Sequence, residues 1–140
     1  MKLLKLIVVI AIVSPMMVSA QCKSFTKKQC LPLLDAFVPS SNFNSAVMMP
    51  GDEADLMMTF YAGQEYRLFV CSEDIIGELN FEVQDEQSTL FASADNENPY
   101  FDFKMQNTKQ LKLKIIVPEQ ENPNRMVHQG CATVMVGSKP

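Results

Sequence analysis

From residue 43 onward, apolar and polar residues alternate in short runs separated by turn residues. The clearest run is 78–84, in which Leu79, Phe81 and Val83 share one face and polar side chains occupy the other. A period of two places successive side chains on opposite faces of a strand. The pattern predicts strands at 43–49, 54–61, 65–71, 78–84, 89–93, 100–105, 110–117 and 130–137.

Strong turn signals separate these runs, among them Pro-Gly-Asp-Glu at 50–53 and Ala-Gly-Gln at 62–64. Many short strands with one polar face and regular turns are typical of antiparallel sandwiches. The sequence therefore predicts an all-β fold, a jelly-roll-like antiparallel β-sandwich of about eight strands. A barrel is the alternative.

The first twenty residues have the three regions of a cleaved export signal. Lys2 and Lys5 give a positive start, an apolar run follows, and Val18-Ser19-Ala20 supplies small residues before a cut at Gln21. The apolar run is shorter than the roughly 20 residues that a membrane-spanning helix needs. A lipoprotein would need a small residue directly before Cys22, where Gln21 stands. We expect an exported protein, periplasmic or extracellular, without stable insertion in the membrane.

The remaining chain divides into a cap and a sandwich. Apolar residues at helical spacing predict a short helical segment over 24–37, which Pro32 splits into two turns. The predicted organisation is a signal peptide at 1–20, a helical cap at 21–42 and a β-sandwich domain at 43–140.

Four cysteines follow the leader: Cys22, Cys30, Cys71 and Cys131. An even number in an exported chain favours two disulfides. Three pairings are open, and we prefer Cys71–Cys131 with Cys22–Cys30, because Cys71 ends one predicted strand and Cys131 begins another. The short pair is the weaker prediction, since one continuous helix over 22–30 would hold its Cα atoms roughly 12 Å apart.

Charge and composition exclude several classes of function. Without Lys2 and Lys5 the chain carries 10 basic and 16 acidic side chains, a net charge of −6. This argues against binding to nucleic acid or anionic membranes, which are bound through clustered lysine and arginine. His128 is the only histidine, and the sequence has no Gly-x-Ser-x-Gly or His-x-x-x-His motif. We therefore predict no enzymatic activity and no obligatory cofactor.

One inter-strand loop could hold calcium. Asp95, Asn96, Glu97 and Asn98, followed by Asp102, offer several hard oxygen ligands. A solvated polar turn is the simpler interpretation, because the spacing does not match an EF-hand.

Methionine and tyrosine residues suggest a contact surface. Met48-Met49 and Met57-Met58 flank the Pro-Gly turn at matching distances, as if they faced each other in a hairpin. One methionine of each pair would fill the core and the other would be exposed. We predict Met49, Met58 and Tyr100 as a contact surface for an unknown protein or a glycan.

The order of turns and strands between Met49 and Val136 resembles a known family. The runs "PGDEADLMMTFYAGQEYRLFVCSE", "GELNFEVQDEQSTLFASADNENPYFDFKM", "QLKLKIIVPE" and "GCATVMVG" carry the likeness. They resemble bacterial pre-peptidase C-terminal domains and related jelly-roll modules. The chain also resembles stand-alone exported proteins of Bacteroidetes-type bacteria that share a Cys-containing N-terminal helix. The resemblance implies a non-catalytic binding or structural module of the cell envelope. The alternative is a carbohydrate- or calcium-binding accessory module for a separately encoded secreted enzyme.

Overall fold

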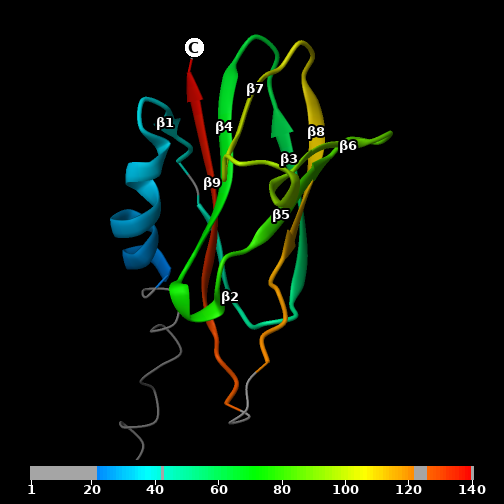
Figure 1. Cartoon of the computed structure of the whole chain (residues 1–140). Helices are drawn as coiled ribbons and strands as arrows, with labels where there is room; N and C mark the ends of the chain where they lie inside the picture. The colour runs from blue at the N-terminus through cyan, green and yellow to red at the C-terminus, as the bar shows by residue number, and fades with distance from the viewer. Residues whose placement is uncertain (1–21, 42, 122–125, 140) are drawn as a thin grey trace, which may run out of the picture.

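A computed structural model describes residues 22–41, 43–121 and 126–139, so the predicted signal peptide lies outside the described residues. Two antiparallel sheets pack face to face (Figure 1). One sheet has the order β1-β9-β4-β7, with β2 also paired to β9, and the other has the order β3-β8-β5-β6. The strands are β1 (Val38–Pro39), β2 (Asn44–Met48), β3 (Glu53–Phe60), β4 (Glu65–Ser72), β5 (Asn80–Gln84), β6 (Thr89–Ala92), β7 (Phe101–Lys104), β8 (Lys109–Ile116) and β9 (Gly130–Lys139).

The predicted all-β sandwich is confirmed, and each of the eight predicted strands is present. The sequence missed β1, because a two-residue strand leaves no periodic pattern to detect. The jelly-roll assignment stays a prediction.

The Pro-Gly turn does not form the hairpin that the methionine pairs suggested. The strand before it, β2, pairs with β9, and the strand after it, β3, pairs with β8 in the other sheet. The turn therefore carries the chain from one sheet to the other. Spacing around a turn cannot distinguish a hairpin from a sheet-to-sheet crossing, because both reverse the chain.

Aromatic rings join the two sheets along the seam between the edge strands β6 and β7. Phe91 of β6 stacks on Phe101 of β7 with centroids 4.8 Å apart, and Phe101 stacks on Phe103 at 4.6 Å. Phe103 continues the contact to Phe60 in the core at 5.1 Å. Such aromatic pairs stabilise the folded state beyond what the burial of their surface area contributes. They close this seam as far as β7 extends.

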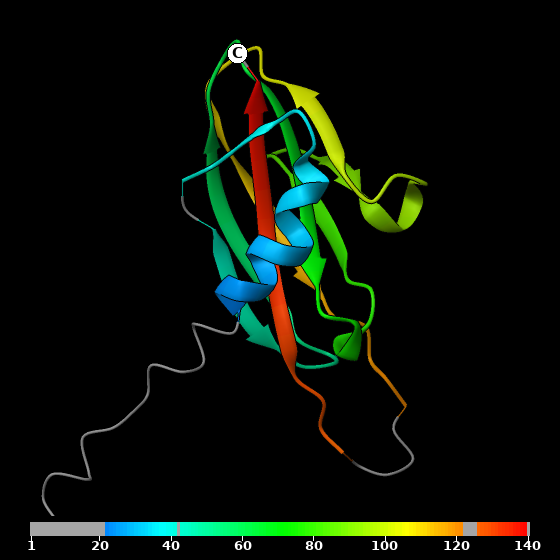
Figure 2. The same cartoon turned by 90° about the vertical axis from the view of Figure 1, so that its left-hand side faces the viewer.

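A helical segment covers the outer face of β9 (Figure 2). Residues 22–25 form an α-helical turn, which continues as a π-helical turn, η2 (Thr26–Cys30), and a 3-10 turn, η3 (Leu31–Leu34), that has Pro32 near its start. β9 is thus buried on both faces over most of its length. This explains its unbroken run of small and apolar residues, which is typical of a strand with no face in water.

Both disulfides attach the helical segment to this sheet. Cys22 is bonded to Cys131 and Cys30 to Cys71, with Cα–Cα distances of 5.4 and 5.8 Å. All four predicted disulfide cysteines are therefore bonded, but the preferred pairing was wrong. In the β4–β9 register Cys71 lies opposite Thr133, two residues from Cys131. Such diagonal positions are roughly 7–8 Å apart, beyond the usual reach of a disulfide.

A small hydroxyl network lies between the helical segment and the sheet. The Thr26 hydroxyl donates to the Cys22 carbonyl oxygen at 2.8 Å and lies 2.8 Å from the Thr133 hydroxyl. Thr133 in turn lies 2.9 Å from the Ser45 hydroxyl on β2. Thr26 and Thr133 are fully buried. Because each finds partners, neither leaves an uncompensated buried polar group.

No helix among the described residues has the length and apolar character needed to cross a membrane.

Candidate functional site

A cleft opens in the seam between the sheets, beside the start of β7. Its volume is about 330 Å³. We call it the seam cleft; its lining comes from β4, the start of β5 and the loop between β6 and β7: Val70, Ser72, Glu78, Leu79, Asn80, Phe81, Ser93, Ala94, Asn96, Glu97 and Pro99. Leu79 and Phe81 are buried and give it an apolar floor. Figure 2 shows the loop before β7 standing out to the right of the sandwich. Residues of this loop form part of the lining.

Among the described residues, no strand pairs with the end of β4 on the side that borders the cleft. Pairing between β4 and β7 ends at Leu68↔Phe101, whereas β4 continues to Ser72. Figure 1 shows β7 beside only the upper part of β4. The Glu73 N–H donates to the Cys131 carbonyl oxygen at 3.0 Å, so odd-numbered residues of this strand direct their backbone groups toward β9. The N–H and C=O groups of Val70 and Ser72 point to the other side, toward the cleft, because these groups alternate between the two sides of a strand from one residue to the next.

The walls of the cleft are acidic. Glu78 precedes β5 and Glu97 lies in the loop between β6 and β7; both line the cleft and both are exposed. The lining contains no lysine or arginine among the residues that the structure describes. A cleft with two carboxylates above an apolar floor favours a ligand that has both positive charge and apolar surface.

The two serines of the cleft serve the fold. The Ser72 hydroxyl donates to the Gly77 carbonyl oxygen at 2.9 Å. The Ser93 hydroxyl accepts a hydrogen bond from the Phe81 N–H at 2.9 Å, which ties the loop to β5. The one histidine, His128, does not line the cleft. The cleft therefore does not combine a serine with an imidazole base.

The five residues predicted to bind calcium do not act as one group. Asn96 and Glu97 line the seam cleft, whereas the Asp102 carboxylate accepts two 2.8 Å hydrogen bonds from the Arg67 guanidinium. Across the described ranges, three or more acidic, cysteine or histidine side chains nowhere gather as metal ligands would. The calcium site stays a prediction without geometric support in this loop.

Tyr100 is largely occupied by a contact within the protein. The Arg67 guanidinium lies 4.1 Å from the centre of the Tyr100 ring and 4.8 Å from that of Phe37. The hydrogen bonds that Arg67 donates to Asp102 raise the pKa of Arg67 above its usual value. Stacking and the bidentate pair together hold the β7 start and the end of the helical segment on the sheet. This leaves one face of Tyr100 unavailable to a sugar.

The predicted methionine surface is divided. Met49 is 41% exposed, as predicted, but Met58 is partly buried and packs against the core. Met57 is the exposed member of its pair, at 55%. Met57 lies on the outer face of β3, whereas Met49 follows β2 in the turn between the sheets. The contact surface with Tyr100 stays a prediction.

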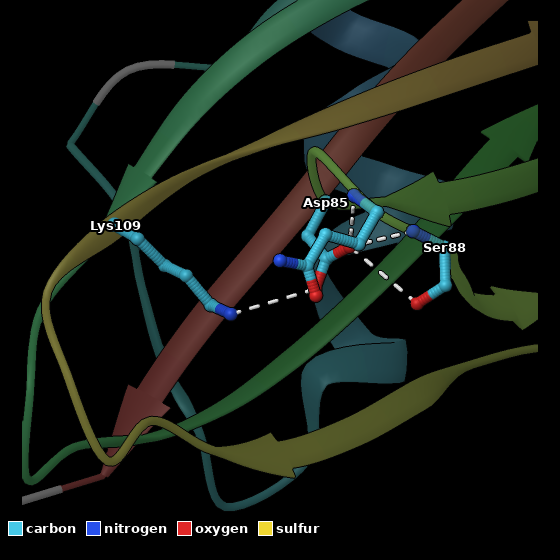
Figure 3. Close-up of polar contacts among 4 residues, drawn as sticks. Asp85, Ser88 and Lys109 are labelled. Atoms are coloured by element: carbon cyan, nitrogen blue, oxygen red, sulfur yellow. Dashed lines mark hydrogen bonds and ion pairs between the residues drawn. The ribbon is translucent and has the colours of Figure 1, made fainter.

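A second, shallower hollow of about 770 Å³ lies on the outer face of the four-stranded sheet. The turn between β5 and β6 forms its rim. There Asp85 accepts hydrogen bonds from the backbone N–H groups of Gln87 and Ser88 at 2.9 and 2.8 Å, and it lies 3.5 Å from the Lys109 ammonium (Figure 3). These backbone hydrogen bonds lower the pKa of Asp85 below its usual value.

We expect the Asp85 carboxylate to stabilise this turn in a pH-dependent way. A lowered pKa in the folded state contributes stability above the unfolded pKa of about 3.9, and the contribution is lost as pH falls through the folded value. Asp85→Asn should therefore melt below the wild type at pH 7, and the difference should shrink below about pH 4. Thermal unfolding from pH 7 to pH 2 measures this. Glu86→Gln, in the same turn, should melt like the wild type, and a difference for Asp85→Asn that does not change with pH would contradict the assignment.

Sequence reasoning missed most of the seam cleft. Its lining comes from three segments that no motif connects, and Glu78 and Val70 read only as ordinary strand residues. The available signal was the polar loop 94–99, which the sequence singled out for calcium and which forms one wall. The point along β4 at which pairing with β7 stops, Leu68, depends on tertiary structure.

Comparisons with known proteins find likeness only at the level of structure. No family model and no curated protein matches the chain. The crystal structure of Aeromonas hydrophila PliG, a periplasmic inhibitor of g-type lysozyme, has 9% identity and a TM-score of 0.49, covering 74% of this chain and 89% of that one. Salmonella Typhimurium PliG has 12% identity and a TM-score of 0.43, covering 70% and 86%. A de novo designed double-stranded β-helix has 10% identity and a TM-score of 0.34, covering 71% and 100%.

At this similarity none of these proteins transfers its activity to this chain. The comparisons also do not support the resemblance to pre-peptidase C-terminal domains or to proteins of Bacteroidetes-type bacteria.

Proposed function

We propose that this chain is an exported, non-catalytic module that binds another protein through the seam cleft. One observation carries the proposal: an apolar floor, a strand edge without a neighbour and two carboxylates meet in one cleft of about 330 Å³. Protein interfaces combine buried apolar contacts with a polar rim in this way.

Export is supported by the two disulfides, because bonds of this kind persist in oxidising compartments. They also fit the leader that the sequence predicts. The compartment that we propose is the periplasm or the extracellular space.

A protein is a better partner than a glycan for this cleft. Sugar-binding sites usually stack sugar rings on exposed aromatic side chains. The Tyr100 ring is stacked on Arg67, and Tyr66 is buried in the core. Tyr61 is 59% exposed, but it follows β3 and does not line the cleft.

The proposal predicts that blocking the cleft abolishes binding. Ala94 is an exposed lining residue, so Ala94→Trp places a large ring at the cleft without disturbing the core. Ala62→Trp, at an exposed turn that does not line the cleft, is the matched control. The immobilised wild type and Ala62→Trp should retain the same protein from secreted and periplasmic fractions, and Ala94→Trp should retain roughly tenfold less or none.

Two outcomes would overturn this function. Equal retention by all three forms would show that the cleft is not the contact site. Retention of glycan alone, or retention that EDTA abolishes and calcium restores, would favour the carbohydrate- or calcium-binding accessory module instead. Measuring the unfolding midpoint of each variant separates blocked binding from loss of fold.

A further inference from the structure

We infer that the partner presents an extended basic segment, which joins the five-stranded sheet as a new strand beside the end of β4. The inference rests on the proposed function and specifies the chemistry of the partner. It follows from the direction of backbone groups in the cleft and from the charge of the cleft walls.

The backbone of β4 provides the docking edge. β7 pairs with β4 only from Glu65 to Leu68, so 69–72 of β4 extends past the first residue of β7, Phe101. The N–H and C=O groups of Val70 and Ser72 point to that side, since the odd-numbered residues bond to β9. An exposed strand edge is a template for pairing with another chain, and extended peptides use such edges in β-strand addition.

The cleft provides room beside this edge. β7 and its aromatic stack fill the same seam next to Tyr66 and Leu68, and the cleft continues it past Phe101. An added segment would thus lie in line with β7. Alternate side chains of that segment would face the buried floor at Leu79 and Phe81.

The charges select a basic segment. Glu78, before β5, and Glu97, in the loop between β6 and β7, both line the cleft. The exposed Asp74 and Asp95 lie on the adjoining 3-10 turns η4 (Asp74–Ile76) and η5 (Ser93–Asp95). Lysine or arginine in the partner would complement these carboxylates, whereas an acidic segment would be repelled. Apolar residues alternating with basic ones would satisfy the floor and the walls together.

A synthetic peptide tests both elements of the inference. The probe is a six-residue peptide in which lysine or arginine alternates with valine, compared with its counterpart carrying glutamate in place of each basic residue. We expect the basic peptide to bind the full exported chain at least roughly tenfold more tightly than the acidic one. Hydrogen exchange at the Val70 and Ser72 amides should slow when the basic peptide is bound.

Matched variants locate the contact. The double variant Glu78→Lys with Glu97→Lys should weaken binding of the basic peptide at least roughly tenfold, and Glu86→Lys, which changes charge in the distant β5–β6 turn, should not. N-methylation at alternate peptide residues whose N–H groups face β4 should also weaken binding. N-methylation at the intervening residues, whose N–H groups face away, should have little effect.

The outcomes separate this inference from the proposed function. If both N-methylated peptides bind equally, or if neither peptide protects Val70 and Ser72, strand addition is wrong. If Ala94→Trp still abolishes capture of a protein partner in that case, the cleft binds a protein by another geometry and the proposed function stands. Equal capture by Ala94→Trp overturns both.

Discussion

Replacing Cys22 and Cys131 together by alanine is expected to lower the free energy of unfolding by about 4–5 kcal/mol. The bond joins residues separated by 109 positions and closes residues 22–131 into one loop. In the chain-entropy model a loop of this length removes that much denatured-state entropy. Since small domains unfold with about 5–15 kcal/mol, the loss is a large fraction of the total. Urea unfolding of the oxidised proteins measures it.

The second disulfide provides a graded comparison. Cys30 and Cys71 are separated by 41 positions, so their double alanine variant should lose slightly less, about 4 kcal/mol. A reducing agent should bring the wild type down to the stability of the variant lacking all four cysteines and leave that variant unchanged. Equal urea midpoints for the oxidised and reduced wild type would contradict the stabilising role. Peptide mapping without reduction should recover Cys22 joined to Cys131, and a Cys22–Cys30 link would refute the pairing.

Gly137→Ala is expected to destabilise the protein by about 1–3 kcal/mol through overpacking. A Cβ at Gly137 would lie 2.6 Å from the Cβ of Phe37 and 2.9 Å from Cδ2 of Leu34. The Phe37 Cβ cannot rotate away, because it is attached to the backbone. The helical segment would have to move off β9, and the Phe37 contact with Arg67 would move with it.

The urea midpoint of Gly137→Ala, compared with Ser138→Ala, measures this effect. Ser138 is the next residue of β9 and is partly exposed, so its variant should unfold close to the wild type. An unchanged midpoint for Gly137→Ala would show that the helical segment does not pack on β9 as described. A change in the NMR chemical shifts of the Tyr100 ring in Gly137→Ala would show that the displacement reaches Arg67, which contacts both Phe37 and Tyr100.

Backbone periodicity accounts for most of what could be predicted. Strands β4, β5 and β8 have clear alternation, and their bounds were predicted to within about two residues. The helical segment was also predicted, with Pro32 near the break between its turns. These features depend on neighbouring residues in the chain, which the sequence displays directly.

The cysteine pairing shows where local reasoning stops. Cys71 and Cys131 do lie on paired strands, but a register difference of two residues separates them, and the helical segment brings Cys22 and Cys30 to the same face. A disulfide depends on Cα separations of a few ångströms. Strand order alone cannot provide that accuracy.

The seam cleft also depends on contacts that the sequence does not display. The polar loop 94–99 is visible in the sequence, but its meaning depends on β4 extending past the last residue paired to β7. Two exposed glutamates become one acidic site only because Glu78 and Glu97 come from different sheet connections that meet at the seam. The spacing of these two residues in the sequence does not predict that their connections meet at the seam.

Local pattern alone therefore determines the all-β class, the positions of the strands and the presence of four cysteines suited to an oxidising compartment. It does so because alternation, turns and composition are properties of adjacent residues. The disulfide pairing, the double burial of β9 and the seam cleft are decided by which strands and turns become neighbours in space. Those contacts are made by residues far apart in the chain, and they follow from the packing of the two sheets and the helical segment as a whole.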